Sequence, residues 1–375
     1  MKIAIGTTRP FHLFHLGREL SKLGHEVTVY SYIPDAYTGK YGIGTSRHIT
    51  VFNASKILAS LALQKKVVSF QQFATERLFS RVDEYIATNL TACDAYIGLS
   101  GMALASLVAA RKLGAIAICD RGASHIARQI TVAAETGQSI SSTEYIYREL
   151  RGYSISDFIA VPSIYSQDTF LQQGVAGNRL FLNNYGVDLN RFTKQRPRLT
   201  KTLNRLLFVG PFSYRKGADL LVRLLDMLPS ITITHVGTPG DVEMPSSTRF
   251  NSVGPVANSK LSEIYRANDI FVFPSRDDGF GMVLLEAIAC GLTVVASRYC
   301  GARDIQKVAP TTGQGIIIFQ DYSIEELVNS IKKAIQLTHQ ERSDDEAADL
   351  RESFSWAAYA LRYERFLKES IEAAN

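Results

Sequence analysis

Short apolar runs alternate along the chain with longer stretches whose apolar residues recur at helical spacing. KIAIG at 2–6 predicts a first strand, FHLFHLGRELSKLG predicts a helix that ends at Gly24, and EVTVYSY at 26–32 predicts a second strand. The series continues with AYIGL (95–99), AIAIC (115–119) and FIAV (158–161). This alternation predicts a parallel sheet that is covered by helices on both faces.

The same alternation restarts in the second half of the chain at RLLFVG (205–210). Its further strands are predicted at SITITHVG (230–237), DIFVFPS (269–275) and LTVVAS (292–297). The stretch between the two series, LNRFTKQRPRLTKTLNR at 189–205, is polar, basic and proline-bearing, as linkers are. We therefore predict an α/β fold of two Rossmann-like, doubly wound domains facing each other across a cleft, over 1–195 and 203–352.

Composition agrees with a globular protein of two domains. The 375 residues are 46% apolar, which is too much chain for one ordinary core. MKIAIGTTRPF begins as a strand rather than as a signal peptide, and no run of 18 uncharged apolar residues is present. The four cysteines form no C-x-x-C pair, so reduced core thiols are expected rather than disulfides or structural zinc. We predict a cytoplasmic protein.

Charge is unevenly distributed between the halves. Residues 1–195 hold 20 Lys and Arg against 14 Asp and Glu, whereas the remainder holds 21 against 22. An anionic substrate or an anionic membrane surface would fit this excess, and so would surface lysines kept only for solubility. Nucleic-acid binding is not expected, because no Lys- and Arg-rich run with interleaved aromatics occurs.

The loop after RLLFVG carries a cationic pair, Arg215 and Lys216, directly before Gly217. Open parallel sheets bind ligands beyond the carboxyl ends of their strands, so the pair is predicted to face the cleft. Lysine as a mobile point charge and arginine as a fork suit a diphosphate. The alternative is an ordinary solvated loop.

The loop after DIFVFPS reads RDDGFGMVLLEAIACG and places acids on both sides of a glycine turn. Gly279 and Gly281 let the backbone bend, and a helix predicted to begin near Gly281 or Met282 would offer free N–H groups to a phosphate. Glu286 lies a turn further along this apolar helix, where a carboxylate needs a polar partner such as a ribose diol. Asp278 would lie where the diphosphate ends and a transferred group begins.

Together these motifs resemble the family-4 retaining glycosyltransferases of the GT-B fold. The pattern acid-G-F-G-x-x-x-x-E-A-x-A-x-G, between a strand ending in PS and TVVAS, is similar to their E-x7-E element. VGPFSYRKG resembles their diphosphate loop, RLFLNNYGVDLNRF their interdomain segment, VGPVANSKLSEIYRANDIFVFPS their base-side loop, and GHEVTVY their second strand. The resemblance covers nearly the whole chain, most strongly 180–300.

This resemblance implies a role for each part of a donor site. Lys216, with Arg215, would hold the donor diphosphate, and amides of the glycine turn would hold its distal phosphate. Glu286 would bind the ribose, Asp278 hydroxyls of the donor sugar, and the loop at Val256 the base. The nucleotide-sugar site so implied comprises Gly210, Arg215, Lys216, Val256, Asp278, Gly279, Phe280, Gly281, Met282, Val283 and Glu286.

The chain departs from the family pattern at several positions. The arginine that usually follows the glycine of the diphosphate loop is Pro211 here, so Arg215 is the first candidate for the second cation. Tyr185-Gly186 stands where the family has Asn-Gly between the domains. Asp278 is one methylene shorter than the usual Glu, and TTRPFHLFH replaces the glycine pair after the first strand.

Histidines of the first half are candidates for substrate contact. The family commonly has a histidine facing the donor sugar in the segment that reads DRGASHIARQ here, and His125 is the nearest candidate, although Asp120 and Arg121 stand closer to the strand. A lone loop histidine can equally be structural. The first strand is followed by three residues that could contact an acceptor: Arg9, His12 and His15.

Residues 54–86 combine an apolar stripe with basic residues at its edges. Such a helix can rest on anionic lipid, or its stripe can pack on the sheet while the basic face is only solvated, which we favour. The basic residues are Lys56, Lys65, Lys66, Arg77 and Arg81.

We predict a retaining hexosyltransferase that moves a hexose from a nucleoside diphosphate sugar, such as UDP-glucose, to a hydroxyl acceptor in polysaccharide or glycolipid synthesis. Asp278, His125, Lys216 and Arg215 are the candidate catalytic residues. No metal and no cofactor besides the donor are expected, because no D-x-D follows a strand.

The acceptor could be lipid-linked, at the inner membrane surface. The alternatives are a UDP-sugar epimerase of the same fold and a catalytically weak binding protein. FSWAAYALRYERFLKESIEAA begins with a possible cap at Ser355 and repeats apolar residues at helical spacing, so we predict a C-terminal helix, 353–375, that crosses back to the first domain.

Overall fold

A computed structural model describes residues 1–8, 11–33, 38–39, 42, 48–50, 68–138, 142–193, 204–338 and 345–374. Arg9, the linker residues 194–203 and the lysines at 56, 65 and 66 lie outside these ranges. The domain boundary predicted near residue 200 falls there too, and it stays a prediction.

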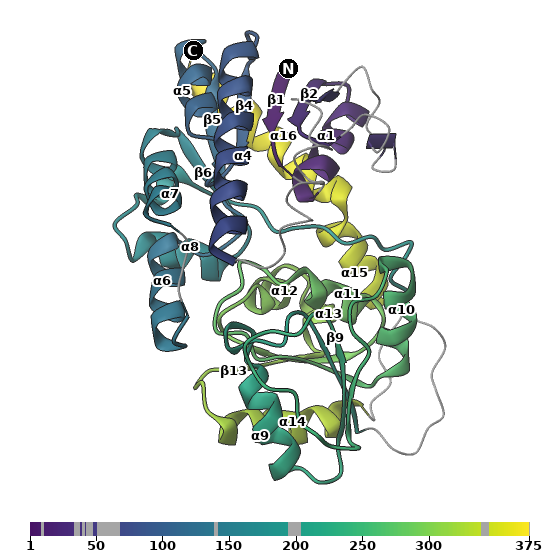
Figure 1. The fold of residues 1–375 in the computed structure, drawn as a ribbon. Helices are drawn as coiled ribbons and strands as arrows, with labels where there is room; N and C mark the ends of the chain where they lie inside the picture. Colours follow the sequence, from purple (N-terminus) through teal and green to yellow (C-terminus); the bar gives the residue numbers. More distant parts are fainter. Residues whose placement is uncertain are drawn as a thin grey trace.

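The first half of the chain forms a parallel sheet of seven strands in the order β3-β2-β1-β4-β5-β6-β7 (Figure 1). The strands are β1 (Lys2–Gly6), β2 (Glu26–Ser31), β3 (His48–Thr50), β4 (Ala95–Leu99), β5 (Ile116–Asp120), β6 (Phe158–Val161) and β7 (Leu180–Leu182). The helices are α1 (His12–Lys22), α4 (Val68–Asn89), α5 (Ala105–Lys112), α6 (Ile126–Glu135), α7 (Thr143–Ile155) and α8 (Ile164–Leu171), and a 3-10 turn spans Gly177–Arg179.

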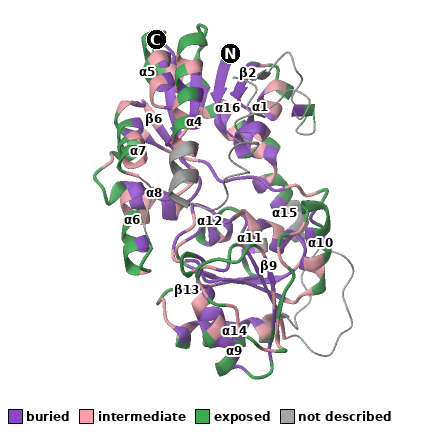
Figure 2. Cartoon of the chain, viewed as in Figure 1, coloured by how far each residue is buried: buried purple, intermediate pink, exposed green. Residues whose placement is uncertain are grey.

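Both faces of this sheet are buried, and that explains its uninterrupted apolar runs. Ile3 and Ile5 of β1 pack with Phe14 of α1 on one face, while Ala4 packs with Val82 of α4 on the other. Figure 2 shows the buried strands inside a shell of helices whose outer faces are exposed. Strands buried on both faces are nearly continuously hydrophobic instead of alternating.

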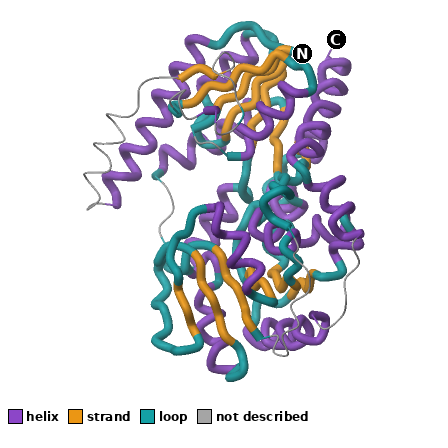
Figure 3. Tube along the Cα trace, turned by 90° about the vertical axis from the view of Figure 1, so that its right-hand side faces the viewer, coloured by secondary structure: helices purple, strands orange, loops and turns teal. Residues whose placement is uncertain are grey.

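The second half forms a parallel sheet of six strands in the order β10-β9-β8-β11-β12-β13 (Figure 3). The strands are β8 (Arg205–Val209), β9 (Thr232–Val236), β10 (Phe250–Ser252), β11 (Ile270–Phe273), β12 (Thr293–Ser297) and β13 (Ile316–Phe319). The helices are α9 (Ala218–Met227), α10 (Asn258–Ala267), α11 (Met282–Ala289), α12 (Ala302–Val308), α13 (Pro310–Gly313), α14 (Ile324–Thr338) and α15 (Asp345–Phe354), and a 3-10 turn spans Tyr214–Lys216.

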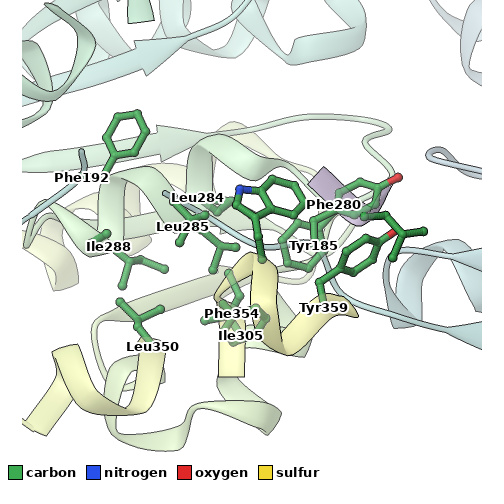
Figure 4. Packing of buried hydrophobic residues seen from close by; sticks show 14 of the residues in the cluster. Tyr185, Phe192, Phe280, Leu284, Leu285, Ile288, Ile305, Leu350, Phe354 and Tyr359 are labelled. Atoms are coloured by element: carbon green, nitrogen blue, oxygen red, sulfur yellow. The ribbon is translucent and has the colours of Figure 1, made fainter. Parts of the chain in front are cut away.

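The last helix, α16 (Trp356–Ala374), leaves the second half and packs against α1 of the first (Figure 1). The break between α15 and α16 falls at Ser355, which pairs with Val187 and whose hydroxyl accepts the N–H of Ala358 at 3.1 Å. One apolar cluster therefore runs from Tyr185 and Tyr359 through Phe280 to α11 (Figure 4).

The predicted fold class is confirmed: two parallel sheets, each with helices on both faces. Every strand that the sequence predicted is present, with ends shifted by at most about two residues. Four further strands were not predicted, namely β3, β7, β10 and β13. All four are edge strands of their sheets.

Candidate functional site

The cationic loop is a single 3-10 turn between β8 and α9. The N–H of Lys216 donates to the carbonyl oxygen of Ser213 at 3.0 Å, and Gly217 then adopts a left-handed conformation with φ of +76°. A Cβ atom on Gly217 would lie 1.9 Å from the carbonyl oxygen of Pro274, so the loop is pressed against the end of β11. Only glycine fits there, and the contact fixes the point from which the Lys216 side chain projects.

Lys216 and Asp278 form an ion pair between Nζ and Oδ2, and both side chains are largely buried. The Lys216 ammonium also lies 5.2 Å from the centre of the Phe273 ring. Burial alone would raise the pKa of Asp278, but the ion pair with Lys216 and the charge of Arg215 outweigh it, so this pKa lies below its ordinary value. Asp278 is therefore ionised at neutral pH and neutralises Lys216.

Arg215 joins the same assembly through the backbone. Its Nη1 donates to the carbonyl oxygen of Asp277 at 3.0 Å, and the N–H of Arg276 donates to the carbonyl oxygen of Arg215 at 2.9 Å. Arg276 in turn forms a bidentate pair with Asp219 at 2.6 and 2.8 Å. The cationic loop and the acid turn are thus one rigid unit at the carboxyl ends of β8 and β11.

The acid turn leads directly into α11. The N–H of Asp278 donates to the carbonyl oxygen of Tyr299 at 3.0 Å, and Oδ1 of Asp278 accepts the N–H of Phe280 at 3.2 Å. Gly281, with φ of +80°, is the N-cap residue of α11, and Met282 and Val283 follow in its first turn. First-turn N–H groups have no intrahelical partner, so they can bind an anion with the positive end of the helix dipole.

Glu286 lies on α11 one turn beyond these groups, with its carboxylate largely buried. Its Oε2 accepts a hydrogen bond from the Tyr265 hydroxyl at 2.9 Å. Burial raises the pKa of Glu286 to about 7, although the Tyr265 hydroxyl and the nearby charge of Arg191 lower it in part. The two acids of this element are therefore in opposite electrostatic states, Asp278 paired with a cation and Glu286 with a neutral hydroxyl.

The remaining predicted donor residues line the neighbouring strand ends. Gly210, directly after β8, accepts a hydrogen bond from His235 Nε2 at 2.9 Å through its carbonyl oxygen. Val256 lies half-buried in the loop after β10, close to Gly254 with φ of +72°. A Cβ on Gly237 would lie 2.0 Å from the Gly210 carbonyl oxygen, which shows how tightly these loops pack.

The segment that carries these residues matches a known protein family. Residues 190–352, which contain all of these donor-side elements, match the family model described as glycosyl transferases group 1. The second half of the chain, at residues 190–352, belongs to this glycosyltransferase family.

Curated relatives of the glycosyltransferase are diverse. The chain is 22% identical to a phosphatidylinositol N-acetylglucosaminyltransferase subunit of Arabidopsis thaliana, over 97% of this chain and 79% of that protein. It is 33% identical to the D-inositol 3-phosphate glycosyltransferase of Mycobacteroides abscessus, over 33% of this chain and 32% of that protein. The chain thus spans well under two thirds of this second relative.

Solved structures share the fold over the whole length. Sucrose-phosphate synthase from Thermosynechococcus elongatus superimposes with a TM-score of 0.69 at 18% identity, covering all of both chains. Anabaena HepE in complex with UDP-glucose superimposes with a TM-score of 0.64 at 17% identity, also over all of both chains. The glycosyltransferase therefore has the GT-B fold.

The acid turn of the glycosyltransferase contacts the first half of the chain directly. A Cβ on Gly279 would lie 2.2 Å from the carbonyl oxygen of Gly122, in the loop after β5. Ser163 and Ser166, at the start of α8, both donate their hydroxyls to the carbonyl oxygen of Gly279. Tyr165 adds a hydrogen bond to Asp277 Oδ1 at 2.7 Å. The ends of the two sheets are thus in contact at this turn.

His125 does not have the surroundings of a general base. It is the N-cap of α6, where its Nδ1 accepts the N–H of Ala127 at 3.1 Å, and its ring packs on Tyr153 and Phe170. Since Nδ1 is an acceptor, the ring proton lies on Nε2, and burial lowers the pKa of His125 to about 4. His125 is therefore neutral, and its Nε2–H can donate a hydrogen bond; its role as a candidate catalytic residue facing the donor sugar stays a prediction.

Arg121 and Asp120, which precede His125, have different partners. Arg121 forms a buried ion pair with Glu149. Asp120, at the end of β5, accepts hydrogen bonds from His12 Nε2 at 2.6 Å and from the Tyr363 hydroxyl at 2.7 Å. The sequence placed His12 only among residues that could contact an acceptor and did not connect it with Asp120 or Tyr363, because these three lie far apart in the chain.

His15 lies one turn after His12 and is held differently. Its ring stacks on Trp356 of α16, with centres 4.2 Å apart and planes 9° apart, and burial lowers its pKa to about 4. His15 therefore belongs to the contact between α1 and α16 rather than to the cleft.

The predicted basic helix is only partly described. Arg77 and Arg81 lie on α4, whereas the three lysines lie outside the described ranges. Within those ranges, no helix is long and apolar enough to cross a membrane. The described residues also contain no cluster of three or more His, Cys, Asp or Glu side chains suited to a metal ion.

Proposed function

We propose that this glycosyltransferase transfers a hexose from a nucleoside diphosphate sugar, with UDP-glucose as the first donor to test, to a hydroxyl acceptor with retention of configuration. The observation that carries the proposal is the assembly of Lys216, Arg215 and the first turn of α11 at one point, with Glu286 one turn away. Cations, helix N–H groups and a carboxylate in this order match a diphosphate followed by a ribose diol.

The departing diphosphate gains negative charge as the bond to the anomeric carbon breaks. Lys216, Arg215 and the N–H groups after Gly281 are fixed before the reaction by the contacts described above, so they would stabilise that charge without reorganising. Glu286 would accept both ribose hydroxyls, the loop at Val256 would face the base, and Asp278 would contact hydroxyls of the sugar. This proposal requires no metal and no further cofactor.

The ion pair with Lys216 also bears on the role of Asp278 as a sugar contact. In the described structure the Lys216 ammonium is paired with the Asp278 carboxylate. A diphosphate that takes over Lys216 would release Asp278, which could then turn to a sugar hydroxyl. Donor binding would thereby exchange one pairing of charges for another.

Relatives support a nucleotide sugar as donor and leave the acceptor broad. HepE was crystallised with UDP-glucose, and two curated relatives are named for transfer to inositol-containing molecules. We propose a hydroxyl acceptor from polysaccharide or glycolipid synthesis, including lipid-linked ones, with a cytoplasmic protein that can associate with the inner membrane surface.

Calorimetry with UDP tests the donor site. Lys216→Ala should weaken UDP binding by roughly 10- to 100-fold, because a hydrogen bond to a charged group contributes about 1.5–3 kcal/mol. Lys332→Ala on the exposed face of α14 serves as the matched control and should leave binding unchanged. Equal affinities in Lys216→Ala and the wild type would overturn the diphosphate assignment. NMR analysis of products would separate transfer from epimerisation, since an epimerase converts UDP-sugar without an acceptor.

A further inference from the structure

His12 is a buried histidine whose two ring nitrogens differ sharply. Its side chain is 2% exposed, and Nε2 is hydrogen-bonded to Asp120 at 2.6 Å. Nδ1 is also buried, and among the described residues it has no hydrogen-bond partner. A buried polar atom without a partner is costly, on the order of 1–3 kcal/mol, so such atoms commonly mark functional positions.

The surroundings of Asp120 fix which nitrogen carries the proton. An ionised carboxylate only accepts hydrogen bonds, and Asp120 receives one from the Tyr363 hydroxyl on Oδ2 and one from His12 on Oδ1. His12 must therefore hold its proton on Nε2, which leaves a lone pair on Nδ1. This is a carboxylate–imidazole pair whose free nitrogen is a hydrogen-bond acceptor.

A second buried group without a partner lies beside His12. The Tyr185 ring lies 4.6 Å from the His12 ring, and its hydroxyl has no partner among the described residues. Burial, with Asp120 and Asp278 nearby, raises the pKa of Tyr185, so its hydroxyl remains a donor. Two adjacent rings thus carry an unsatisfied acceptor and an unsatisfied donor, the two kinds of group that a substrate hydroxyl can satisfy.

Gly122 lies between the pair of His12 and Tyr185 and the acid turn. A Cβ on Gly122 would lie 2.7 Å from the Tyr185 hydroxyl and 3.8 Å from His12 Cε1, while the Gly122 carbonyl oxygen meets Gly279. The Tyr185 ring also contacts Phe280 of the turn, with centres 5.8 Å apart. His12 and Tyr185 therefore stand within one residue of the place where the donor sugar is proposed to lie.

We propose that His12, oriented by Asp120, is the group that takes the proton from the hydroxyl receiving the sugar, and that Tyr185 donates a hydrogen bond to the same oxygen. The assignment rests on the proposed function. The hydroxyl oxygen bonds to the anomeric carbon, the electron pair of the broken bond leaves with the nucleoside diphosphate, and the hydroxyl proton moves to His12 Nδ1. Asp120 then stabilises the imidazolium. Asp120 and Tyr363 are positioning residues.

Several titratable or charged groups set the environment of His12. Asp120 contacts it from β5, Tyr185 from the loop after β7, and His15 lies one turn away on α1, whereas Tyr359, Tyr363 and Arg121 act through Asp120 or Tyr185. A general base takes up a proton only while its lone pair is free, so this role predicts an acid limb in the pH profile of turnover.

The test uses the full chain with UDP-glucose and water as the probe acceptor. His12→Gln should lower turnover by about 100-fold or more and remove the acid limb of the pH profile. UDP affinity should stay within about twofold. His15→Gln is the matched control, because His15 is a half-buried histidine of α1 that also has an unpartnered Nδ1, and it should keep both turnover and acid limb. Turnover of His12→Gln within about threefold of the wild type, or a persisting acid limb, would overturn the assignment.

A second measurement does not depend on turnover. Long-range proton–nitrogen NMR on the full chain should show His12 with its proton on Nε2, and Asp120→Asn should move the proton to Nδ1, because the amide would donate to Nε2. A wild-type proton on Nδ1 would contradict the inference even if the donor site is correct. Loss of UDP binding or of UDP-glucose turnover in the wild type would instead contradict the proposed function, and the spectrum would still decide the role of His12.

Discussion

The proposed donor side and the proposed acceptor side of the cleft hold their polar groups in different ways. On the donor side, Lys216, Asp278 and the first turn of α11 come from two loops, and glycines bring their backbones together. On the other side, Asp120 is bound by side chains from the first helix and the last helix of the chain. The proposed donor side is therefore built locally, from two loops whose backbones touch, whereas the opposite side is a network of side chains from distant parts of the chain.

We expect the largest effect on turnover from a change at the contact between Gly279 and Gly122, where the two sides meet. Gly279→Ala places a methyl group 2.2 Å from the Gly122 carbonyl oxygen, a backbone atom that cannot move alone. The two halves must separate, and a misplacement of about 1 Å can reduce turnover by about 100-fold. UDP-glucose turnover should fall by this factor, and the melting temperature should fall as well, because the apolar cluster shared by the two halves is disturbed. Gly177→Ala, which meets only an ordinary contact at 3.7 Å, is the control. Full activity of Gly279→Ala would show that this contact is not kept during turnover.

The two acids of the donor side should respond in opposite directions. Asp278→Ala removes the carboxylate that neutralises Lys216, so UDP should bind with equal or higher affinity, up to about tenfold. Glu286→Ala removes the proposed ribose partner and should weaken UDP by roughly 10-fold. Calorimetry on both variants measures the difference. Parallel losses of affinity would refute the proposed separation of their roles.

Donor affinity should depend on pH through Glu286. The pKa of this group is about 7 in the free protein, and a ribose diol donates best to the ionised form. The proton is bound below pH 7 and must be released on binding, so affinity for UDP-glucose should fall about tenfold from pH 8 to pH 6. The measurement uses UDP-glucose instead of UDP, because the terminal phosphate of UDP itself titrates near pH 6 and would add its own pH dependence. In Glu286→Gln the profile should be flat; a slope that persists would assign it to another group.

The smallest effect is expected at Tyr265, which acts only through Glu286. Tyr265→Phe removes the 2.9 Å hydrogen bond and leaves the ring in the core. A bond of this kind contributes about 0.5–1.5 kcal/mol, so affinity for UDP should change by less than about tenfold. Tyr214→Phe is the control, because it removes the same hydroxyl group from an exposed tyrosine of the cationic loop. A larger loss than in Glu286→Ala would mean that Tyr265 contacts the donor itself.

The sequence predicted the parts of the molecule that are built locally and missed those that depend on contacts between distant residues. The interior strands and the cationic and acidic loops were predicted because each is a contiguous pattern of a few residues. β3, β7 and β10 were missed because each is only three residues long, whereas β13, IIIF, is as apolar as the interior strands and could have been predicted. Pairing of Lys216 with Asp278 was also missed, since 62 residues separate them.

The first half was harder because its polar network depends on tertiary contacts. Nothing at positions 12, 120, 185 and 363 indicates that they meet, and only the crossing of α16 brings Tyr363 to Asp120. His125 shows another gap. Its position after a strand suggested chemistry, and the structure adds a role that the sequence did not indicate, as the N-cap of α6.

The crossing of α16 also bears on how the chain folds as it is synthesised. Tyr363 and Leu367 of this helix belong to the same apolar cluster as Ile3, Ile5 and Phe14, at the opposite end of the chain. The sheet of the first half therefore keeps an uncovered face until α16 has been synthesised, whereas the second sheet can close before α16 is complete. A chain that stops before Trp356 should expose the apolar face of its older half and become a substrate for chaperones or proteases.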